Sequence, residues 1–86
     1  GFNIESASLD ANFGHLIINF NGFAGEEYNI QLMDISGNVI FNDKFIASTD
    51  GKNMSKSYFN QVADGIYVVS LTNSKGITKY SKVSPR

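Results

Sequence analysis

The stretch that decides the fold is GIYVVSL at residues 65–71, followed at once by TNSKG at 72–76 and ITKYSKV at 77–83. β-branched and aromatic residues dominate both outer segments, as is typical of strands with one buried face. The polar, glycine-containing segment between them has the composition of a tight turn. We therefore predict a β-hairpin near the C-terminus, with Tyr67, Val69 and Leu71 facing inward.

Short apolar runs separated by glycines extend this strand pattern upstream of the hairpin. Proline occurs once, at Pro85, and no window shows a sustained helical period. Short strands at regular spacing with turn signals between them are typical of an all-β sandwich. We predict a seven-stranded antiparallel immunoglobulin- or fibronectin-like β-sandwich, with strands at residues 2–9, 15–20, 28–34, 39–46, 53–60, 65–71 and 77–83.

The alternation of apolar and polar residues assigns one face of each strand to the core. The weak strand at 53–60 is expected to be anchored by Met54, Tyr58 and Phe59. Turns or loops are expected at 10–12, 21–25, 35–38, 47–52, 61–64 and 73–76. A positive φ at Gly37 or Gly65 would support the turns assigned there. Together with Tyr67, Val69 and Leu71, the predicted inward side chains are Leu16, Ile18, Phe20, Tyr28, Ile30, Leu32, Val39, Phe41 and Phe45.

Length and composition restrict the possible functions. The 86 residues suffice for one domain, predicted to span residues 1–86. The chain has no cysteine, so neither a disulfide nor a thiolate metal site is available. A net charge of −1 with interspersed signs argues against nucleic acid as a partner, and the apolar runs are too short for a membrane span. The start at Gly1-Phe2, without methionine, indicates a mature or excised segment.

No group of residues has the spacing of a catalytic, cofactor or metal site. His15 is the only histidine, and it lacks partners for a metal site or for a catalytic triad in a recognisable setting. Glu26 and Glu27 are adjacent, so on a strand they would point to opposite faces rather than form a carboxylate pair. We predict no catalytic, cofactor or metal residue; a calcium ion held by loop carboxylates is an open alternative.

Two aromatic residues could be exposed and could mark a binding surface. Phe23 lies in a glycine-rich loop, and Tyr80 lies on the last strand. Exposed aromatic side chains often contact proteins or sugars. The structural alternative, in which Phe23 folds back to plug its loop, stays open.

Three blocks together resemble the C-terminal sorting domains of the type IX (Por) secretion system of Bacteroidetes. They are YNIQLMDISGNVI at residues 28–40, DGIYVVSL at 64–71 and KYSKV at 79–83. The resemblance covers about residues 13–83. It implies a seven-stranded sandwich that serves as an address label of an exported protein, recognised by the secretion machinery and destined for an extracytoplasmic location.

The resemblance also implies roles for individual residues. Asp34 and Gly37 would shape a turn, and Gly65 and Tyr67 would set the terminal hairpin. Lys79 and Lys82 would belong to a recognised terminal strand, although lysine on a strand also guards an edge against unwanted pairing.

The first functional hypothesis is therefore a non-enzymatic sorting or surface-attachment domain. The alternative is a free-standing secreted fibronectin-like binding module with a protein or glycan partner on the cell surface. Similar motifs also occur in small free-standing sandwich domains of Bacteroides.

Overall fold

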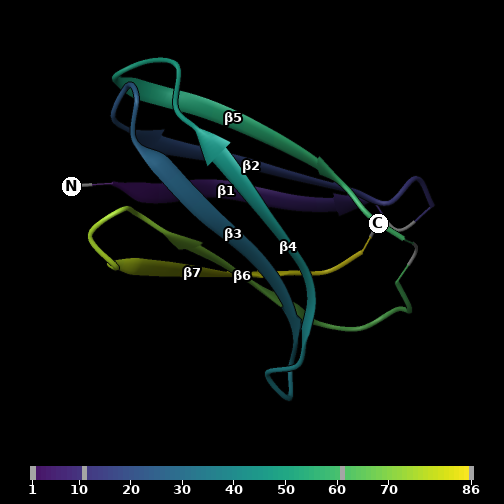
Figure 1. Ribbon diagram of the computed structural model, residues 1–86. Coiled ribbons are helices and arrows are strands. Elements are labelled where there is room, and N and C mark those ends of the chain that lie inside the picture. Colours follow the sequence, from purple (N-terminus) through teal and green to yellow (C-terminus); the bar gives the residue numbers. More distant parts are fainter. Residues whose placement is uncertain (1, 11, 61, 86) are drawn as a thin grey trace.

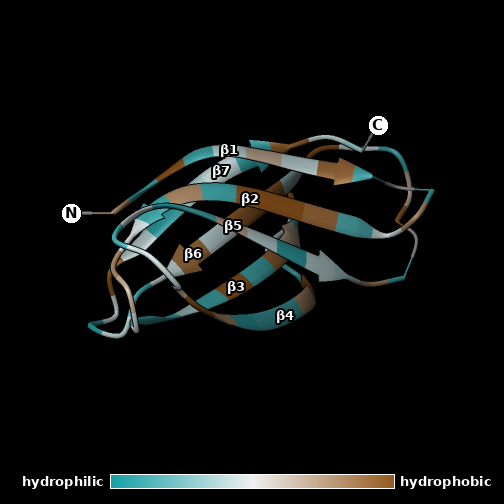
Figure 2. Ribbon diagram, turned by 90° about the horizontal axis from the view of Figure 1, so that it is seen from above, coloured by the Kyte–Doolittle hydropathy of each residue, from teal (hydrophilic) through white to brown (hydrophobic). Residues whose placement is uncertain are grey.

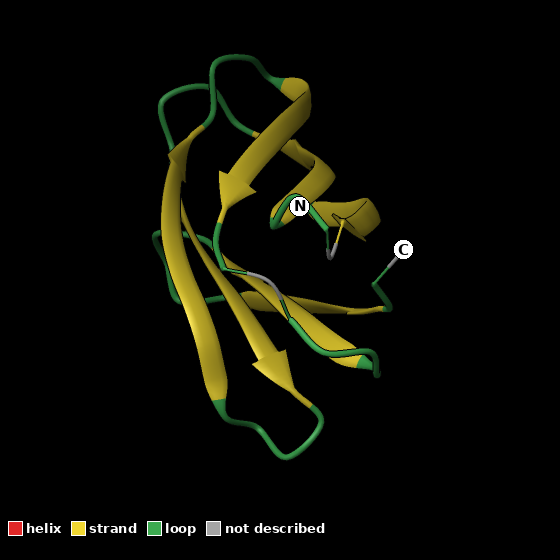
Figure 3. Ribbon diagram, turned by 90° about the vertical axis from the view of Figure 1, so that its right-hand side faces the viewer, coloured by secondary structure: helices red, strands yellow, loops and turns green. Residues whose placement is uncertain are grey.

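The structure is a computed structural model that describes residues 2–10, 12–60 and 62–85. The described residues form seven strands and no helix. The strands are β1(Asn3–Asp10), β2(His15–Gly22), β3(Glu27–Asp34), β4(Val39–Ile46), β5(Gly51–Tyr58), β6(Tyr67–Thr72) and β7(Thr78–Val83). One sheet has the order β1-β2-β5 and the other β4-β3-β6-β7, with every ladder antiparallel. The two sheets face each other as layers (Figures 1 and 3). The predicted seven-stranded antiparallel β-sandwich is confirmed.

The strand boundaries agree with the prediction to within a few residues. β2 continues two residues further than expected, to Gly22, and the fifth strand is shifted towards the N-terminus, at Gly51–Tyr58 rather than 53–60. The turn residue Ala11 and the connector residue Gln61 lie outside the described residues. Gly37 and Gly65 have φ of 89° and 151°, which supports the turns assigned to them.

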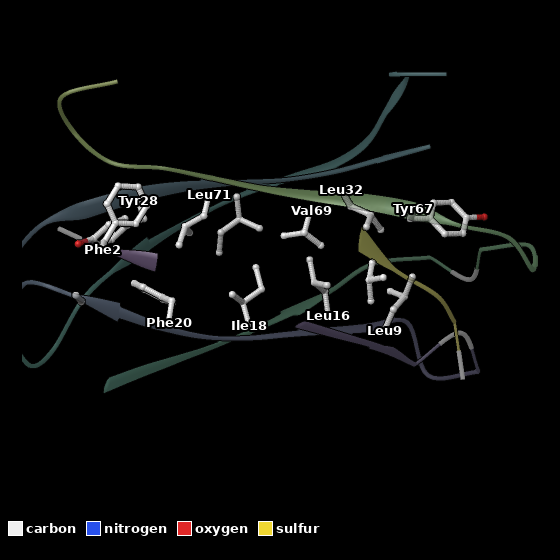
Figure 4. Packing of buried hydrophobic residues seen from close by; sticks show 13 residues of the cluster. Phe2, Leu9, Leu16, Ile18, Phe20, Tyr28, Leu32, Tyr67, Val69 and Leu71 are labelled. Atoms are coloured by element: carbon white, nitrogen blue, oxygen red, sulfur yellow. The ribbon is translucent and has the colours of Figure 1, made fainter. Parts of the chain in front are cut away.

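The core lies between the sheets, as two facing rows of apolar side chains (Figure 4). The most hydrophobic stretches fall on β2 and β6, near the centre of the sandwich (Figure 2). Because successive residues of a strand point to opposite faces, alternate residues of β2 and β3 are buried. Phe41, Phe45 and Phe59 pack against the core from its margin. The buried apolar residues are Phe2, Leu9, Leu16, Ile18, Phe20, Tyr28, Ile30, Leu32, Ala47, Tyr67, Val69, Leu71 and Val83.

The inward placement of Val39 was wrong: its side chain is 47% exposed. The ladder between β3 and β4 shifts register between Leu32 and Met33, so that Leu32 faces Phe41 whereas Met33 faces Val39. Such a shift breaks the alternation of faces along the strand. This end of the β3–β4 hairpin also projects beyond the other strands (Figure 1), where no opposite sheet covers it.

The anchors assigned to the fifth strand were also wrong for Met54 and Tyr58, which are 58% and 64% exposed. The register with β2 instead turns the small polar residues of β5 inward, Asn53, Ser55 and Ser57. Ser57 donates a hydrogen bond of 2.7 Å to Asp43 on β4, which links the two sheets. The β4–β5 side of the sandwich is therefore closed by a polar contact from β5 together with the phenylalanines of β4.

Ser55, on the inner face of β5, has an unsatisfied buried hydroxyl group: its oxygen has no hydrogen-bond partner within the described part of the chain. A buried hydroxyl without a partner costs about 1–3 kcal/mol. We expect Ser55→Ala to raise the free energy of unfolding by about 1 kcal/mol, measured by urea denaturation. Ser57→Ala, which breaks the bond to Asp43, is the matched control and should lower it; a loss of stability with Ser55→Ala would contradict the assignment.

Candidate recognition site

Asp34 and Gly37 form the turn between β3 and β4. One carboxylate oxygen of Asp34 accepts hydrogen bonds of 2.9 Å from the backbone N–H groups of Ser36 and Asn38, and the other accepts one of 3.0 Å from the Asn38 side chain. The Asn38 side-chain bond, helped by the backbone N–H groups, lowers the pKa of Asp34. Asp34 and Gly37 thus shape the turn, and both carboxylate oxygens of Asp34 accept hydrogen bonds from residues of the turn itself.

Gly65 and Tyr67 set the start of the terminal hairpin. Tyr67 is buried at one end of the core, and its hydroxyl donates a bond of 2.6 Å to the carbonyl of Ala63. Gly65 lies between these two residues with a positive φ. The pair therefore shapes the entry into β6 and leaves no side chain free for a partner.

The register of β6 and β7 places the three exposed residues of the last strand on different faces. Lys79 lies opposite Leu71 and so belongs to the row that faces the other sheet. Tyr80 and Lys82 lie opposite Ser70 and Val68, on the outer face of the four-stranded sheet. The terminal strand therefore presents two separate chemical surfaces.

Lys79 and Phe23 meet in a cleft at the end of the sandwich, which we call the end cleft. Its volume is about 340 Å³, and its lining residues are Phe2, Phe23, Glu26, Asn73, Lys75, Ile77 and Lys79. The Lys79 ammonium lies 5.9 Å from the centre of the Phe2 ring, and the Phe23 side chain is half exposed. Tyr80 and Lys82 are not among its lining residues. Three segments that are distant in sequence thus build one small cleft.

Short hydrogen bonds hold the walls of the end cleft. Glu26 accepts bonds of 2.7 Å from the Ser74 hydroxyl and 2.8 Å from the Tyr28 hydroxyl. These bonds, the one from Ser74 foremost, lower the pKa of Glu26, while burial above all raises the pKa of Tyr28. The Tyr28 hydroxyl also accepts the N–H of Phe23 at 3.0 Å. One carboxylate therefore ties the loop that carries Phe23 to the β6–β7 turn.

The β6–β7 turn is fixed by a second local network. The side-chain oxygen of Asn73 accepts the backbone N–H groups of Lys75 and Ile77 at 3.0 and 2.9 Å. This leaves the Lys75 side chain on the surface, on the same cleft as Lys79. The end cleft thus combines apolar walls with two ammonium groups, and its one carboxylate already accepts two hydrogen bonds. Such a site suits an apolar group that carries a negative charge nearby.

Sequence reasoning found Phe23 and Lys79 but missed the other residues of the end cleft. Phe2, Glu26 and Lys75 carry no motif, and only the folded chain brings them together. Among the described residues, no group of three or more His, Cys, Asp or Glu side chains could hold a metal ion. None of these residues forms a helix long and apolar enough to cross a membrane.

Residues 12–84 match the family described as the secretion system C-terminal sorting domain. The chain belongs to this family. The match includes β2 to β7, and with them the β3–β4 turn, the terminal hairpin and most of the end cleft. No curated protein matches the chain.

Membership of the sorting-domain family confirms the resemblance read from the three sequence blocks. The family is a sorting signal of type IX secretion rather than a catalytic family, and the secretion machinery recognises its members. Proteins that carry such a domain are exported and have an extracytoplasmic destination.

Proposed function

We propose that this sorting domain is a non-enzymatic label that the secretion machinery reads at the end cleft and along β7. The observation that supports the proposal is the position of Lys79. Within the KYSKV block at residues 79–83, which resembles the family's terminal strand, only Lys79 also lines the end cleft, beside Phe23. A partner that contacts this end would touch the last strand and the 23–26 loop together.

The contacts around β7 favour recognition by side chains over addition of a strand. β7 is the edge of its sheet, and an exposed edge can accept a further strand. Here an isolated bridge joins Leu9 at the end of β1 to Pro85, just after β7. Proline also offers no backbone N–H to a partner strand. The end of β7 is therefore flanked, whereas the side chains of Lys79, Tyr80 and Lys82 are accessible.

The proposal is tested by fusing residues 1–86 behind a reporter with a signal peptide, in a host that has type IX machinery. We expect the intact domain to direct export of the reporter, and removal of residues 77–86 to stop it. We further expect Lys79→Glu combined with Phe23→Ala to reduce export at least about tenfold, because one ammonium group and one exposed ring of the cleft are removed together. The measurement is the ratio of reporter outside the cell to reporter in the periplasm.

Lys56→Glu is the matched control, since Lys56 lies on the outer face of the three-stranded sheet and undergoes the same charge change. It should leave export unchanged. Protease resistance of the periplasmic reporter fusion separates lost recognition from lost folding. A reporter that stays periplasmic with the intact domain contradicts the label function. Normal export of the double variant contradicts only the end cleft as the recognised surface.

A further inference from the structure

The outer face of the four-stranded sheet carries a shallow depression away from the end cleft. Its volume is about 680 Å³, and its lining residues are Asn29, Gln31, Asn42, Asp43, Lys44 and Thr72. The residues come from the neighbouring strands β4, β3 and β6. In the ladder between β3 and β4, Asn29 faces Lys44 and Gln31 faces Asn42, so the polar side chains form a compact square. We call this surface the amide face.

The three amides of this face differ from the amides of the opposite sheet in their hydrogen bonding. On the opposite sheet, Asn19 donates to the Ser6 hydroxyl and Asn21 donates to Asn3, each at 3.0 Å. Asn29, Gln31 and Asn42 make no side-chain hydrogen bond within the described residues. Each primary amide offers two N–H donors and a carbonyl acceptor. The face therefore presents three sets of unused donors and acceptors on adjacent strands.

The charged groups at the margin of the amide face are already engaged. Lys44 forms an ion pair of 3.5 Å with Glu27, and Asp43 accepts the Ser57 hydroxyl on the other sheet. The exposed pair contributes little stability, but it places opposite charges side by side. Lys44 and Glu27 balance each other's charge, and the Asp43 carboxylate is directed towards the other sheet, since Asp43 lies opposite the buried Ile30. The outer surface of the face therefore carries no unbalanced charge, which favours an uncharged ligand over an anion or a cation.

An exposed aromatic ring lies on the same row of the sheet. Gln31 pairs with Ser70, and Ser70 pairs with Tyr80, so the three lie in line across β3, β6 and β7. With strands about 4.8 Å apart, the backbones of Gln31 and Tyr80 are about 10 Å apart. Tyr80 is 66% exposed, while Ser70 between them is buried. The row therefore places an amide and an exposed aromatic ring two strands apart on the same face of the sheet.

We propose that the amide face binds a neutral oligosaccharide. Sugar hydroxyls both donate and accept hydrogen bonds, as primary amides do, and the C–H faces of a sugar ring pack against an aromatic ring. A peptide would need unpaired backbone groups or apolar pockets, and the middle of this sheet offers neither. The proposal goes beyond the sorting function and uses residues outside the end cleft.

The test is a titration of the ¹⁵N-labelled 86-residue chain with chemically defined neutral hexasaccharides of glucose, mannose, galactose and xylose. Side-chain NH₂ groups give their own signals in a ¹H–¹⁵N correlation spectrum. We expect at least one sugar at millimolar concentration to shift, saturably, the NH₂ signals of Asn29, Gln31 and Asn42. The signals of Asn19 and Asn21, which already donate within the protein, should stay in place.

Variants then assign the binding to this face. Gln31→Ala and Tyr80→Ala should each weaken the affinity about tenfold, because each removes one of the two kinds of contact. Asn19→Ala, on the outer face of the other sheet, is the matched control and should leave it unchanged. Folding of each variant is confirmed by the dispersion of its backbone amide signals. The Phe23 and Lys79 variants should bind the sugar normally, and the Gln31 variant should be exported normally, so the two proposals fail separately.

Three results would overturn the proposal. The first is the absence of saturable shifts with all four sugars, and the second is a shift that survives Gln31→Ala and Tyr80→Ala. The third is binding confined to a negatively charged hexasaccharide of alternating uronic acid and acetylated aminosugar, run in parallel. That last result would mean that charge rather than amide chemistry governs the face.

Discussion

Replacing Leu32 with alanine is expected to lower the free energy of unfolding by about 2–5 kcal/mol. Leu32 is fully buried in the middle of β3, between Phe41 on β4 and Val69 on β6. The substitution removes apolar surface from the core and leaves a cavity that the surrounding sheet cannot fill completely. Domains of this size are typically stable by only about 5–15 kcal/mol, so the loss would be a large share of the total. Urea denaturation followed by circular dichroism measures it.

Met54→Ala is the matched control for Leu32→Ala. The side chains are similar in size; the sequence predicts Leu32 to face the core and Met54 to anchor the fifth strand. In the structure Met54 is 58% exposed on the outer face of β5, so its truncation should cost well under 1 kcal/mol. Equal losses for the two variants, or an unchanged midpoint with Leu32→Ala, would show that the facing of β3 or β5 is wrong.

The sequence predicted the fold because alternation of apolar residues is strong on the central strands. β2, β3 and β6 are each flanked by two strands and covered by the opposite sheet, so one row of their side chains must be apolar. On the edge strands the requirement for an apolar row is weaker. β5 turns Asn53, Ser55 and Ser57 inward, and Asn53 and Ser57 form hydrogen bonds there with loop and β4 groups. A pattern of apolar residues cannot reveal that choice, and it misled the assignment of Met54 and Tyr58.

The register shift in the β3–β4 ladder is likewise invisible in the alternation of apolar residues. Up to Leu32 the alternation holds, and Phe41 faces inward opposite it. The register shift beyond this pair depends on how the turn between Asp34 and Asn38 closes, through several bonds to one carboxylate. The sequence indicated a turn at this place but not its effect on the register. Val39 was therefore assigned to the wrong face.

The candidate site was only partly predictable for a different reason. Residues that shape turns, such as Asp34 and Gly37, act locally and leave a local pattern. The end cleft instead depends on Glu26 meeting Ser74, at a separation of 48 residues. The amide face depends on Asn29, Gln31 and Asn42 meeting across a ladder. Contacts of this kind become visible only when topology and register are known.

Gly14→Ala is expected to be the most damaging glycine substitution, with a loss of more than about 3 kcal/mol. Gly14 precedes β2 with a φ of 66°, a left-handed conformation that costs alanine about 1 kcal/mol. An added methyl group would also overlap the backbone carbonyl oxygen of Phe59. The carbonyl of Gly14 accepts the Phe59 N–H at 2.8 Å, so this contact ties the start of β2 to the segment after β5.

Gly76→Ala separates the two causes of that loss. Gly76 has a φ of 83°, also in the left-handed region, but an added methyl group there would meet no atom within 4 Å. Its substitution should therefore cost only the backbone strain, about 1 kcal/mol. The difference between the two variants, read from urea denaturation of both, measures the close approach of Gly14 to Phe59. Because backbone lies on both sides of this contact, relief requires one strand end to move, and the β2–β5 ladder should fray there first. Equal losses for the two variants would show that this approach does not hold the three-stranded sheet together.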